Sequence, residues 1–232
     1  MTNLQVQLTT QLLQTKSLPV SPAWLNNFLS TISAAQRNTP IPALTQTALF
    51  RLLTSDFRES LTSRSTTIFP IDVFDANIQE RRLAGPIPVQ VLDIEDIGTS
   101  AWSQIEAIER IERGEAIRGR EIVRTVNIGD VDQDGHAAAN ASGSNGPYRL
   151  MLQDAKGTRA IGIEMKSIPG IAIGKIAIGA KLLLRSVTVA RGMVLLTPES
   201  VTVLGGKIEA MDQAWRAGRK ERLLQQITEA GN

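Results

Sequence analysis

The 232-residue sequence contains no cysteine, one histidine and one tyrosine. Without cysteine it can form neither a disulfide nor a thiolate metal site, and the single His136 provides no basis for a histidine metal site or a catalytic triad. Tyr148 begins an expected strand without catalytic neighbours, which favours structural packing over covalent attachment to DNA. No apolar run is long enough to span a membrane, and the N-terminus lacks the blocks of a secretory signal. We therefore expect a reducing intracellular compartment.

Net charge is also small, because 25 basic and 23 acidic residues leave +2. The balance is uneven along the chain, however. Residues 148–207 contain nine basic and three acidic side chains, whereas residues 97–147 contain five basic and eight acidic ones. The sequence thus predicts a basic region that is preceded by an acidic one.

Apolar residues recur at helical spacing in three segments near the N-terminus. Leu8 and Leu12 belong to the first segment, Ser21-Pro22 is typical of the start of the second, and the third follows two prolines near residue 40. Short helices cannot each bury an apolar stripe alone, so they should pack together. We predict a three-helix bundle over residues 1–62, followed by a connector over residues 63–86.

Alternation of apolar and polar side chains dominates residues 87–207, and Asp154–Gly157 supplies a hairpin turn with glycine. Short strands at hairpin spacing, with glycines where a small barrel must bend, are typical of an OB-fold. The predicted class is α+β: the helical bundle, then a five-stranded OB-fold barrel with a long insertion at 97–147 after its first strand. A C-terminal helix over 208–232, weakened at Gly218, completes the prediction.

The insertion is several times longer than an ordinary loop, and long excursions from rigid barrels often carry function. Its first part, Ser100–Ile117, has isoleucines at helical spacing among charged residues and predicts a short, weakly amphipathic helix. Residues 121–127 are expected to be extended. Residues 128–146 are rich in Gly, Ala, Ser, Asn and Asp, which predicts mobility in the free protein.

Two motifs that suggest chemistry are incomplete. Asp130–Gly135 copies the first half of a calcium loop, but Ala141 stands where the bidentate glutamate is needed, so a solvated acidic turn is favoured. Gly170–Ile176 superficially resembles a phosphate loop, but it is one residue short and has Ile176 in place of the magnesium-binding hydroxyl. It is interpreted as a connection across the barrel end. We therefore expect no metal, no cofactor and no enzymatic activity.

Six segments of the chain, in the same order, resemble the N-terminal half of one known family. They are Ser21–Leu25, Leu52–Arg58, Ser100–Ile105, Pro169–Gly170, Gly179–Leu184 and Arg191–Glu209. The family is the RecQ-mediated genome instability protein family, a non-enzymatic partner of topoisomerase III. The resemblance implies a nuclear complex with topoisomerase III and a RecQ helicase that dissolves double Holliday junctions and decatenates DNA during repair, recombination and replication. Longer members carry a second barrel module for which this sequence has no match, and residues 128–146 have no counterpart.

In that family the insertion reaches toward the topoisomerase gate and biases its opening and closing. An exposed tryptophan with apolar neighbours is the usual composition of an interaction hot spot. The predicted contacts are therefore Trp102, Ile105, Ile108 and Ile111, with Ile122, Val123 and Val126 as secondary anchors, and Lys181 at the barrel rim. Two alternatives remain: Trp102 folds back to plug the barrel mouth, and Lys181 is a solvated strand end.

The alternative function is single-stranded DNA binding, for which a basic OB-fold is a common platform. Such sites need aromatic faces for the bases, and residues 148–207 contain one aromatic side chain. Basic groups alone would give weak, strongly salt-dependent phosphate binding. The main candidates for this contact are Arg149, Lys156, Lys175 and Arg185, with Arg159, Lys166, Lys181 and Arg191 beside them.

Overall fold

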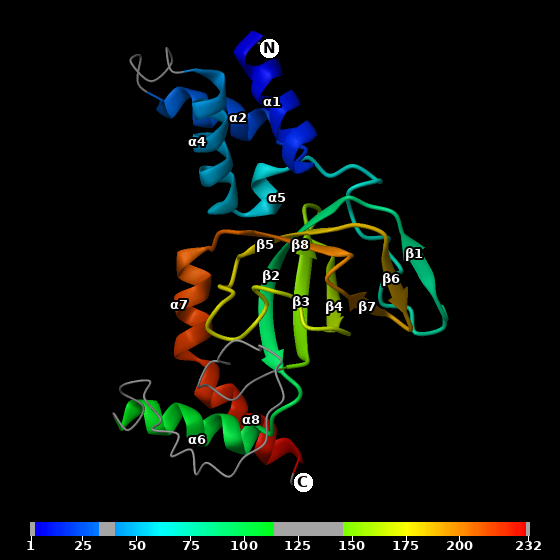
Figure 1. Cartoon of the computed structure of the whole chain (residues 1–232), viewed down its shortest axis with the longest axis vertical. Helices are drawn as coiled ribbons and strands as arrows, with labels where there is room; N and C mark the ends of the chain where they lie inside the picture. Colours follow the sequence, from blue (N-terminus) through cyan, green and yellow to red (C-terminus); the bar gives the residue numbers. More distant parts are fainter. Residues whose placement is uncertain (1–2, 33–39, 114–145, 231–232) are drawn as a thin grey trace, which may run out of the picture.

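The computed structural model describes residues 3–32, 40–113 and 146–230. Its helical domain contains four helices in these ranges (Figure 1). Their bounds are α1 Asn3–Lys16, α2 Pro22–Thr31, α4 Ile41–Leu53 and α5 Phe57–Ser60. The third predicted helix, whose apolar stripe was expected to continue through Phe57 to about Leu61, is two helices, because the chain breaks between Leu53 and Phe57. Asp56 begins α5 by accepting a hydrogen bond from the N–H of Arg58 at 2.9 Å.

One apolar cluster holds these helices together. Its fully buried members come from each of the four helices and from the turns between them, as the predicted stripes require. They include Leu8, Leu12, Leu18, Leu25, Phe28, Leu44, Ala48, Leu52 and Phe57. Ser21 occupies the N-cap position of α2 but makes no capping hydrogen bond with its side chain, so Pro22 at the first helical position is the feature that marks this start.

The described residues contain one sheet of eight strand segments, in the order β1-β6-β7-β4-β3-β2-β5-β8. The bounds are β1 Arg81–Leu83, β2 Ile87–Asp96, β3 Tyr148–Asp154, β4 Arg159–Glu164, β5 Lys181–Leu184, β6 Val187–Ala190, β7 Met193–Leu196 and β8 Val201–Gly205. β2 pairs with both β3 and β5, and β4 pairs with β7 in parallel, so the sheet curls on itself.

Two bends explain why the sheet has more segments than the five strands predicted. β5 leads into β6 through Arg185 and Ser186, and Ser186 has a positive φ of 47°. β7 leads into β8 through a turn at Thr197–Ser200. Since β5 pairs with β8 and β6 pairs with β7, this bent hairpin turns a corner of the barrel. β1 is an additional short strand that the connector contributes beside β6.

The barrel core is formed by alternate residues of the strands and by the segment between β4 and β5. It includes Val89, Val91, Leu150, Leu152, Ala160, Leu182, Leu184, Val187, Val194 and Leu196. Ile171 and Ile176 of the segment that resembles a phosphate loop are buried in the same core. That segment connects β4 to β5, as interpreted from the sequence, and its isoleucines pack in the barrel.

The predicted turn at Asp154–Gly157 is confirmed, and Gly157 has a positive φ of 94°. Asp154 is fully buried and does more than begin the turn. Its carboxylate accepts hydrogen bonds from the N–H groups of Lys156 at 2.9 Å, Thr158 at 2.8 Å and Phe69 at 2.8 Å. Because Phe69 belongs to the connector, Asp154 also attaches the connector to the barrel.

The helical domain packs directly on one end of the barrel. Ala155 of the β3–β4 turn and Leu204 of β8 belong to its apolar cluster. Gly206, at φ 83°, lies against the end of α4, where an added Cβ would be 2.3 Å from the carbonyl oxygen of Leu53. Only glycine permits this approach between the two backbones.

The opposite end of the barrel carries two helices, α6 Ala101–Glu112 and α8 Arg219–Ala230, and α7 Glu209–Ala217 runs along the side of the barrel toward them (Figure 1). The C-terminal helix predicted as one element is therefore two, and the break falls at Gly218. α6 packs against α8, so the start of the insertion and the end of the described chain lie together. Among the described residues, no helix combines the length and the apolarity that a membrane span requires.

Candidate protein-interaction site

The start of α6 is fixed by local capping. Ser100 at the N-cap accepts a hydrogen bond on its Oγ from the N–H of Ser103 at 3.2 Å. The helix predicted from Ser100 is thus confirmed as far as Glu112, and the remainder of that prediction lies outside the described residues. Ile105 is buried, whereas Trp102 and Ile111 are 66% and 65% exposed. α6 therefore packs on the protein through its middle and presents apolar groups near both of its ends.

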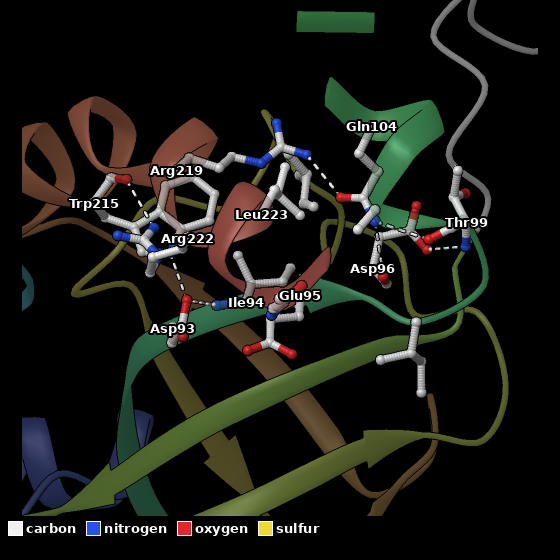
Figure 2. Close-up of a pocket in the computed structure, with 14 residues that line it drawn as sticks. Asp93, Ile94, Glu95, Asp96, Thr99, Gln104, Trp215, Arg219, Arg222 and Leu223 are labelled. Atoms are coloured by element: carbon white, nitrogen blue, oxygen red, sulfur yellow. Dashed lines mark hydrogen bonds between the residues drawn. The ribbon is translucent and has the colours of Figure 1, made fainter. Parts of the chain in front are cut away.

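Gln104 attaches α6 to the residues around it on two sides. Its Nε2 donates to the carbonyl oxygens of Asp96 at 3.0 Å and Thr99 at 2.9 Å. Its Oε1 accepts from Nη2 of Arg219 at 3.1 Å, as Figure 2 shows. The side chain of Gln104 is buried, so losing one of these bonds leaves a polar group of this contact without its protein partner.

α7 and α8 are in turn attached to strand β2. Trp215 donates from its indole Nε1 to Oδ1 of Asp93. The guanidinium groups of Arg219 and Arg222 lie 5.8 Å and 5.5 Å from the centre of the Trp215 ring, and Arg222 also donates to the Trp215 carbonyl at 2.8 Å. Arg222 lies over Trp215 and passes close to Gly218 at the break between the helices. A Cβ added at Gly218 would be 2.9 Å from the Arg222 guanidinium, so glycine leaves room for it.

Charged side chains cover the outer edge of the α6–α8 contact. Nζ of Lys220 lies 2.7 Å from the carboxylate of Glu112 and 3.3 Å from that of Glu109. Beneath these pairs, Ile105 of α6 and Leu223 of α8 are both buried. We call this set, Gln104, Ile105, Glu109, Glu112, Arg219, Lys220 and Leu223, the α6–α8 junction.

A cavity of about 160 Å³ remains between β2, α6 and the C-terminal helices. Asp93, Glu95 and Asp96 border it from the strand, and Arg219 and Arg222 border it from α8 (Figure 2). Burial lowers the pKa of Arg219, and the nearby Asp96 carboxylate opposes that shift. In the described part of the chain no buried side-chain nitrogen or oxygen lacks a hydrogen bond.

The structure divides the predicted insertion contacts into three groups. Trp102 and Ile111 are exposed, so the alternative in which Trp102 plugs the barrel mouth is wrong. Ile108 is half-buried. Ile105 is buried in the α6–α8 junction and is not accessible to a partner, contrary to the prediction. The secondary anchors Ile122, Val123 and Val126 lie outside the described residues.

Lys181 is not at the exposed rim of the barrel. Its side chain is fully buried where the helical domain meets the barrel, so both the rim position and the alternative of a solvated strand end are wrong. Its Nζ donates to Oε1 of Gln90 at 3.0 Å and lies 4.7 Å from the centre of the Phe57 ring. The sequence placed Lys181 at a strand start correctly, but it gave no sign that α5 covers that end of the strand.

A buried polar network surrounds Lys181. Oε1 of Gln90 also accepts from the N–H of Phe57 at 3.0 Å, and its Nε2 donates to Asp56 Oδ1 at 2.9 Å and to Gln153 Oε1 at 3.1 Å. The network joins α5 to strands β2, β3 and β5. We call Asp56, Phe57, Gln90, Gln153 and Lys181 the helical-domain junction.

Both charged groups of this junction have shifted pKa values. Burial lowers the pKa of Lys181 from 10.5 to about 7, and the Asp56 carboxylate opposes that shift. Burial alone would raise the pKa of Asp56, but hydrogen bonds from Arg58 and Gln90 outweigh it and hold the pKa below its ordinary value. The pKa of each of the two groups is therefore set by its surroundings in the junction.

The four main candidates for a DNA contact are exposed and come from different parts of the barrel. Arg149 forms an ion pair with Glu95 at 2.5 Å, and Arg185 donates to Oγ of Ser17 at 2.7 Å. Lys156 follows β3 and Arg149 begins it, which separates their backbones by roughly 20 Å at the rise of an extended strand. Lys175 lies in the segment between β4 and β5. Nucleic-acid binding through these residues stays a prediction.

Among the described residues, no group of three or more His, Asp or Glu side chains is arranged to hold a metal ion. The calcium-loop candidate Asp130–Gly135 lies outside those residues, as do His136 and Ala141. Tyr148 is buried at the start of β3, where the sequence analysis favoured packing.

Sequence reasoning missed most residues that hold α6 in place. Gln104 was overlooked because a single glutamine in a charged helix resembles a solvated residue. Trp215 lies within the predicted C-terminal helix, but its partner Asp93 is 122 residues earlier in the chain, so no local pattern indicates their contact. The signal that was available is the spacing of Arg219 and Arg222, four and seven residues after Trp215, which lets both guanidinium groups stack on the ring.

Comparisons with known proteins agree with this architecture. Residues 12–60 match the family model described as "RMI1, N-terminal helical domain", and residues 69–219 match "RMI1, N-terminal OB-fold domain". The chain is 30% identical over 204 residues to RecQ-mediated genome instability protein 1 of Schizosaccharomyces pombe, covering 84% of each protein. It is 27% identical over 209 residues to the Mus musculus protein of the same name, where the match covers 88% of this chain and 30% of the mouse protein.

The two matched models coincide with the two parts of the structure, since the first ends at α5 and the second extends from the connector to the start of α8. The second model alone covers more than half of the chain. The helical domain, the OB-fold barrel and their order in the chain are therefore those of the family. This chain belongs to the RecQ-mediated genome instability protein 1 family.

Proposed function

We propose that this protein is a non-enzymatic subunit that binds topoisomerase III and, through it, a RecQ-family helicase, in the nucleus. In this complex it promotes decatenation and the dissolution of double Holliday junctions during DNA repair, recombination and replication. The proposal is supported by membership of a family whose relatives are named for RecQ-mediated genome instability. It extends that name to a specific partner and a specific step.

The observation that carries the proposal is the exposed tryptophan that α6 presents at the base of the insertion. Trp102 is 66% exposed on a helix that is held from behind, and Ile111 near the other end of that helix is 65% exposed. Large aromatic groups that become buried on binding supply much of the energy of protein interfaces. Trp102 is thus the group that we assign to the contact with topoisomerase III, with Ile111 at the other end of the helix.

An insertion that is held at its base can act on a topoisomerase gate without chemistry of its own. It needs only to bind the open and closed states of the gate with different affinity, and a difference of a few kcal/mol changes their populations by one to several orders of magnitude. The barrel acts in this proposal as the rigid body to which the insertion is attached.

Trp102→Ala tests the contact directly. Removal of a hot-spot tryptophan typically costs about 2 kcal/mol or more, so we expect at least roughly thirtyfold weaker binding to topoisomerase III. The stability of the free protein should not change, because the side chain is mostly exposed. The measurement is titration calorimetry of purified topoisomerase III with each variant, followed by a decatenation assay at saturating protein.

Phe50→Ala is the matched control. Phe50 is also a 66% exposed aromatic residue, but it lies on α4 of the helical domain. We expect its loss to leave binding unchanged. Equal losses from both variants would show that exposed aromatic groups contribute without regard to position, and no loss from Trp102→Ala would reject the assigned contact.

A further inference from the structure

The orientation of α6 depends on a residue that is buried. Gln104 lies on the inner side of α6, where one amide group bonds both to the loop that precedes the helix and to the helix behind it. The bonds to the Asp96 and Thr99 carbonyls set where α6 leaves β2. The bond from Arg219 sets the angle at which α6 crosses α8.

The helix behind α6 is itself held on the barrel. Arg219 and Arg222 both lie over Trp215, and Trp215 is hydrogen-bonded to Asp93 of β2. A continuous series of contacts thus extends from the barrel strand through Trp215 and α8 to Gln104, and both ends of this series lie on β2 or the residues that follow it (Figure 2). Such a closed arrangement holds a helix in one orientation, whereas a single contact would act as a pivot.

We infer that Gln104 is a positioning residue for partner binding: with Arg219 of α8 it fixes the orientation in which α6 presents Trp102 and Ile111. This inference rests on the proposed contact between α6 and topoisomerase III. A surface that is ordered before binding loses less conformational entropy when the partner arrives, and therefore binds more tightly. Gln104 contributes to affinity in this way without contacting the partner.

Gln104→Glu is the substitution that tests the inference most sharply, because it retains the size and shape of the side chain. The oxygen that accepts from Arg219 is kept, but the donor that faces the carbonyls of Asp96 and Thr99 becomes a second acceptor. Arg219→Ala removes the opposite bond and serves as an independent variant if Gln104→Glu folds poorly. Arg219→Lys retains a donor and should recover part of the effect. Glu106→Gln is the control, since Glu106 is exposed on α6 and pairs only with Arg110 among the contacts resolved for it.

The orientation of α6 can be measured without the partner, because the chain has no cysteine and two introduced cysteines are labelled specifically. Ala107→Cys on α6 and Ser167→Cys on the barrel are both exposed positions. Spin labels at these positions should give one narrow distance distribution by double electron–electron resonance in the parent and in the Glu106→Gln control. We expect Gln104→Glu and Arg219→Ala to broaden it. An unchanged distribution in both variants would overturn the inference.

Affinity for purified topoisomerase III is then measured with the same proteins. We expect roughly tenfold weaker binding for Gln104→Glu and Arg219→Ala, a smaller loss for Arg219→Lys, and none for Glu106→Gln. A broadened distribution with affinity retained within about twofold would also overturn the positioning role. Absence of binding by the parent protein would instead reject the proposed function, and the distance measurement would still show whether Gln104 orients α6.

Discussion

At the end of the barrel next to the helical domain, Gln90 and Lys181 are completely buried, and their side chains bond to one another and to α5. At the opposite end, the α6–α8 junction buries Gln104 and Ile105, but its ion pairs are exposed and Trp102 next to it faces solvent. Both ends join a helical element to the same small barrel. They differ in how much of the contact is removed from water.

This difference indicates that the two ends of the barrel have different roles. A fully buried polar network is costly to leave partly unsatisfied, so the helical-domain junction should form once, during folding, and stay formed. The α6–α8 junction has a small buried part and an exposed edge, so it can hold a helix in place at a modest energetic cost and leave apolar groups for a partner. Stability should therefore depend mainly on the first end and partner binding on the second.

Gln90→Leu should have the largest effect on stability. The substitution keeps the approximate size of the side chain but removes the partner of the Phe57 N–H, of Nζ of Lys181 and of Oε1 of Gln153. Asp56 loses one hydrogen bond and keeps those from Arg58. We expect the free energy of unfolding to fall by about 3 kcal/mol or more, because buried polar groups left unpaired cost about 1 to 3 kcal/mol each. Urea denaturation followed by circular dichroism measures the change.

Gln213→Leu is the control for this variant, since Gln213 is exposed on α7 and donates to Glu209 within the same helix. Its substitution should change stability by less than about 0.5 kcal/mol. A loss below about 1 kcal/mol for Gln90→Leu would remove the contrast between the two ends. It would mean that the helical-domain junction relaxes or admits water when Gln90 is absent.

Lys181 gives the same junction a pH dependence whose sign follows from its pKa. The folded protein holds Lys181 at a pKa of about 7, because burial disfavours the charged form, whereas the unfolded chain has an ordinary value near 10.5. Between these values unfolding takes up a proton, so stability rises with pH; below pH 7 both states are charged and the penalty is constant. Asp56, at the N-cap of α5, is the charged group that acts on the ammonium, and it does not change charge in this window because its pKa is held below its ordinary value.

We expect the wild-type protein to gain about 2 kcal/mol of stability between pH 7 and pH 9 from this one group. Lys181→Met should remove that gain and be at least as stable as the wild type below pH 7, because it removes a buried charge while Gln90 keeps its bond to Phe57. Lys175→Met, at an exposed lysine of the barrel, should retain the wild-type profile. If the stability of the wild type and of Lys181→Met changed with pH in the same way, the Lys181 ammonium would be solvated in the folded protein.

The sequence was informative where a pattern is local and repeated. The alternation in β3 and the turn at Asp154–Gly157 were predicted because period and turn chemistry are properties of adjacent residues. The bend at Ser186, inside the run Lys181–Val189 that was interpreted as one strand, was not, since a bend changes neither hydrophobicity nor period. The break between α4 and α5 was missed for a related reason, because the apolar stripe continues through Phe57, whereas the start of α5 is fixed by the cap at Asp56 and by packing on Gln90.

The candidate site was predictable in position but not in accessibility. Trp102, Ile105 and Ile111 were all expected to meet a partner, because periodicity shows which residues are apolar and does not show what lies behind the helix. Only the fold brings α8 to the inner side of α6, 115 residues later in sequence, and so separates buried Ile105 from exposed Trp102. The burial of Lys181 escaped prediction in the same way, since Phe57 covers it from another domain.

Lys220→Ala should have the smallest effect and tests the exposed edge of the α6–α8 junction. The carboxylates of Glu112 and Glu109 raise the pKa of Lys220, but the pairs are open to solvent, where a screened charge contributes little. We expect Tm to fall by no more than about 2 °C at low salt, with the difference disappearing near 1 M salt as the Debye length shrinks to about 3 Å. Differential scanning calorimetry at the two salt concentrations measures it. A large loss that persists at high salt would mean that Lys220 is part of a buried network, and the two ends of the barrel would then be built alike.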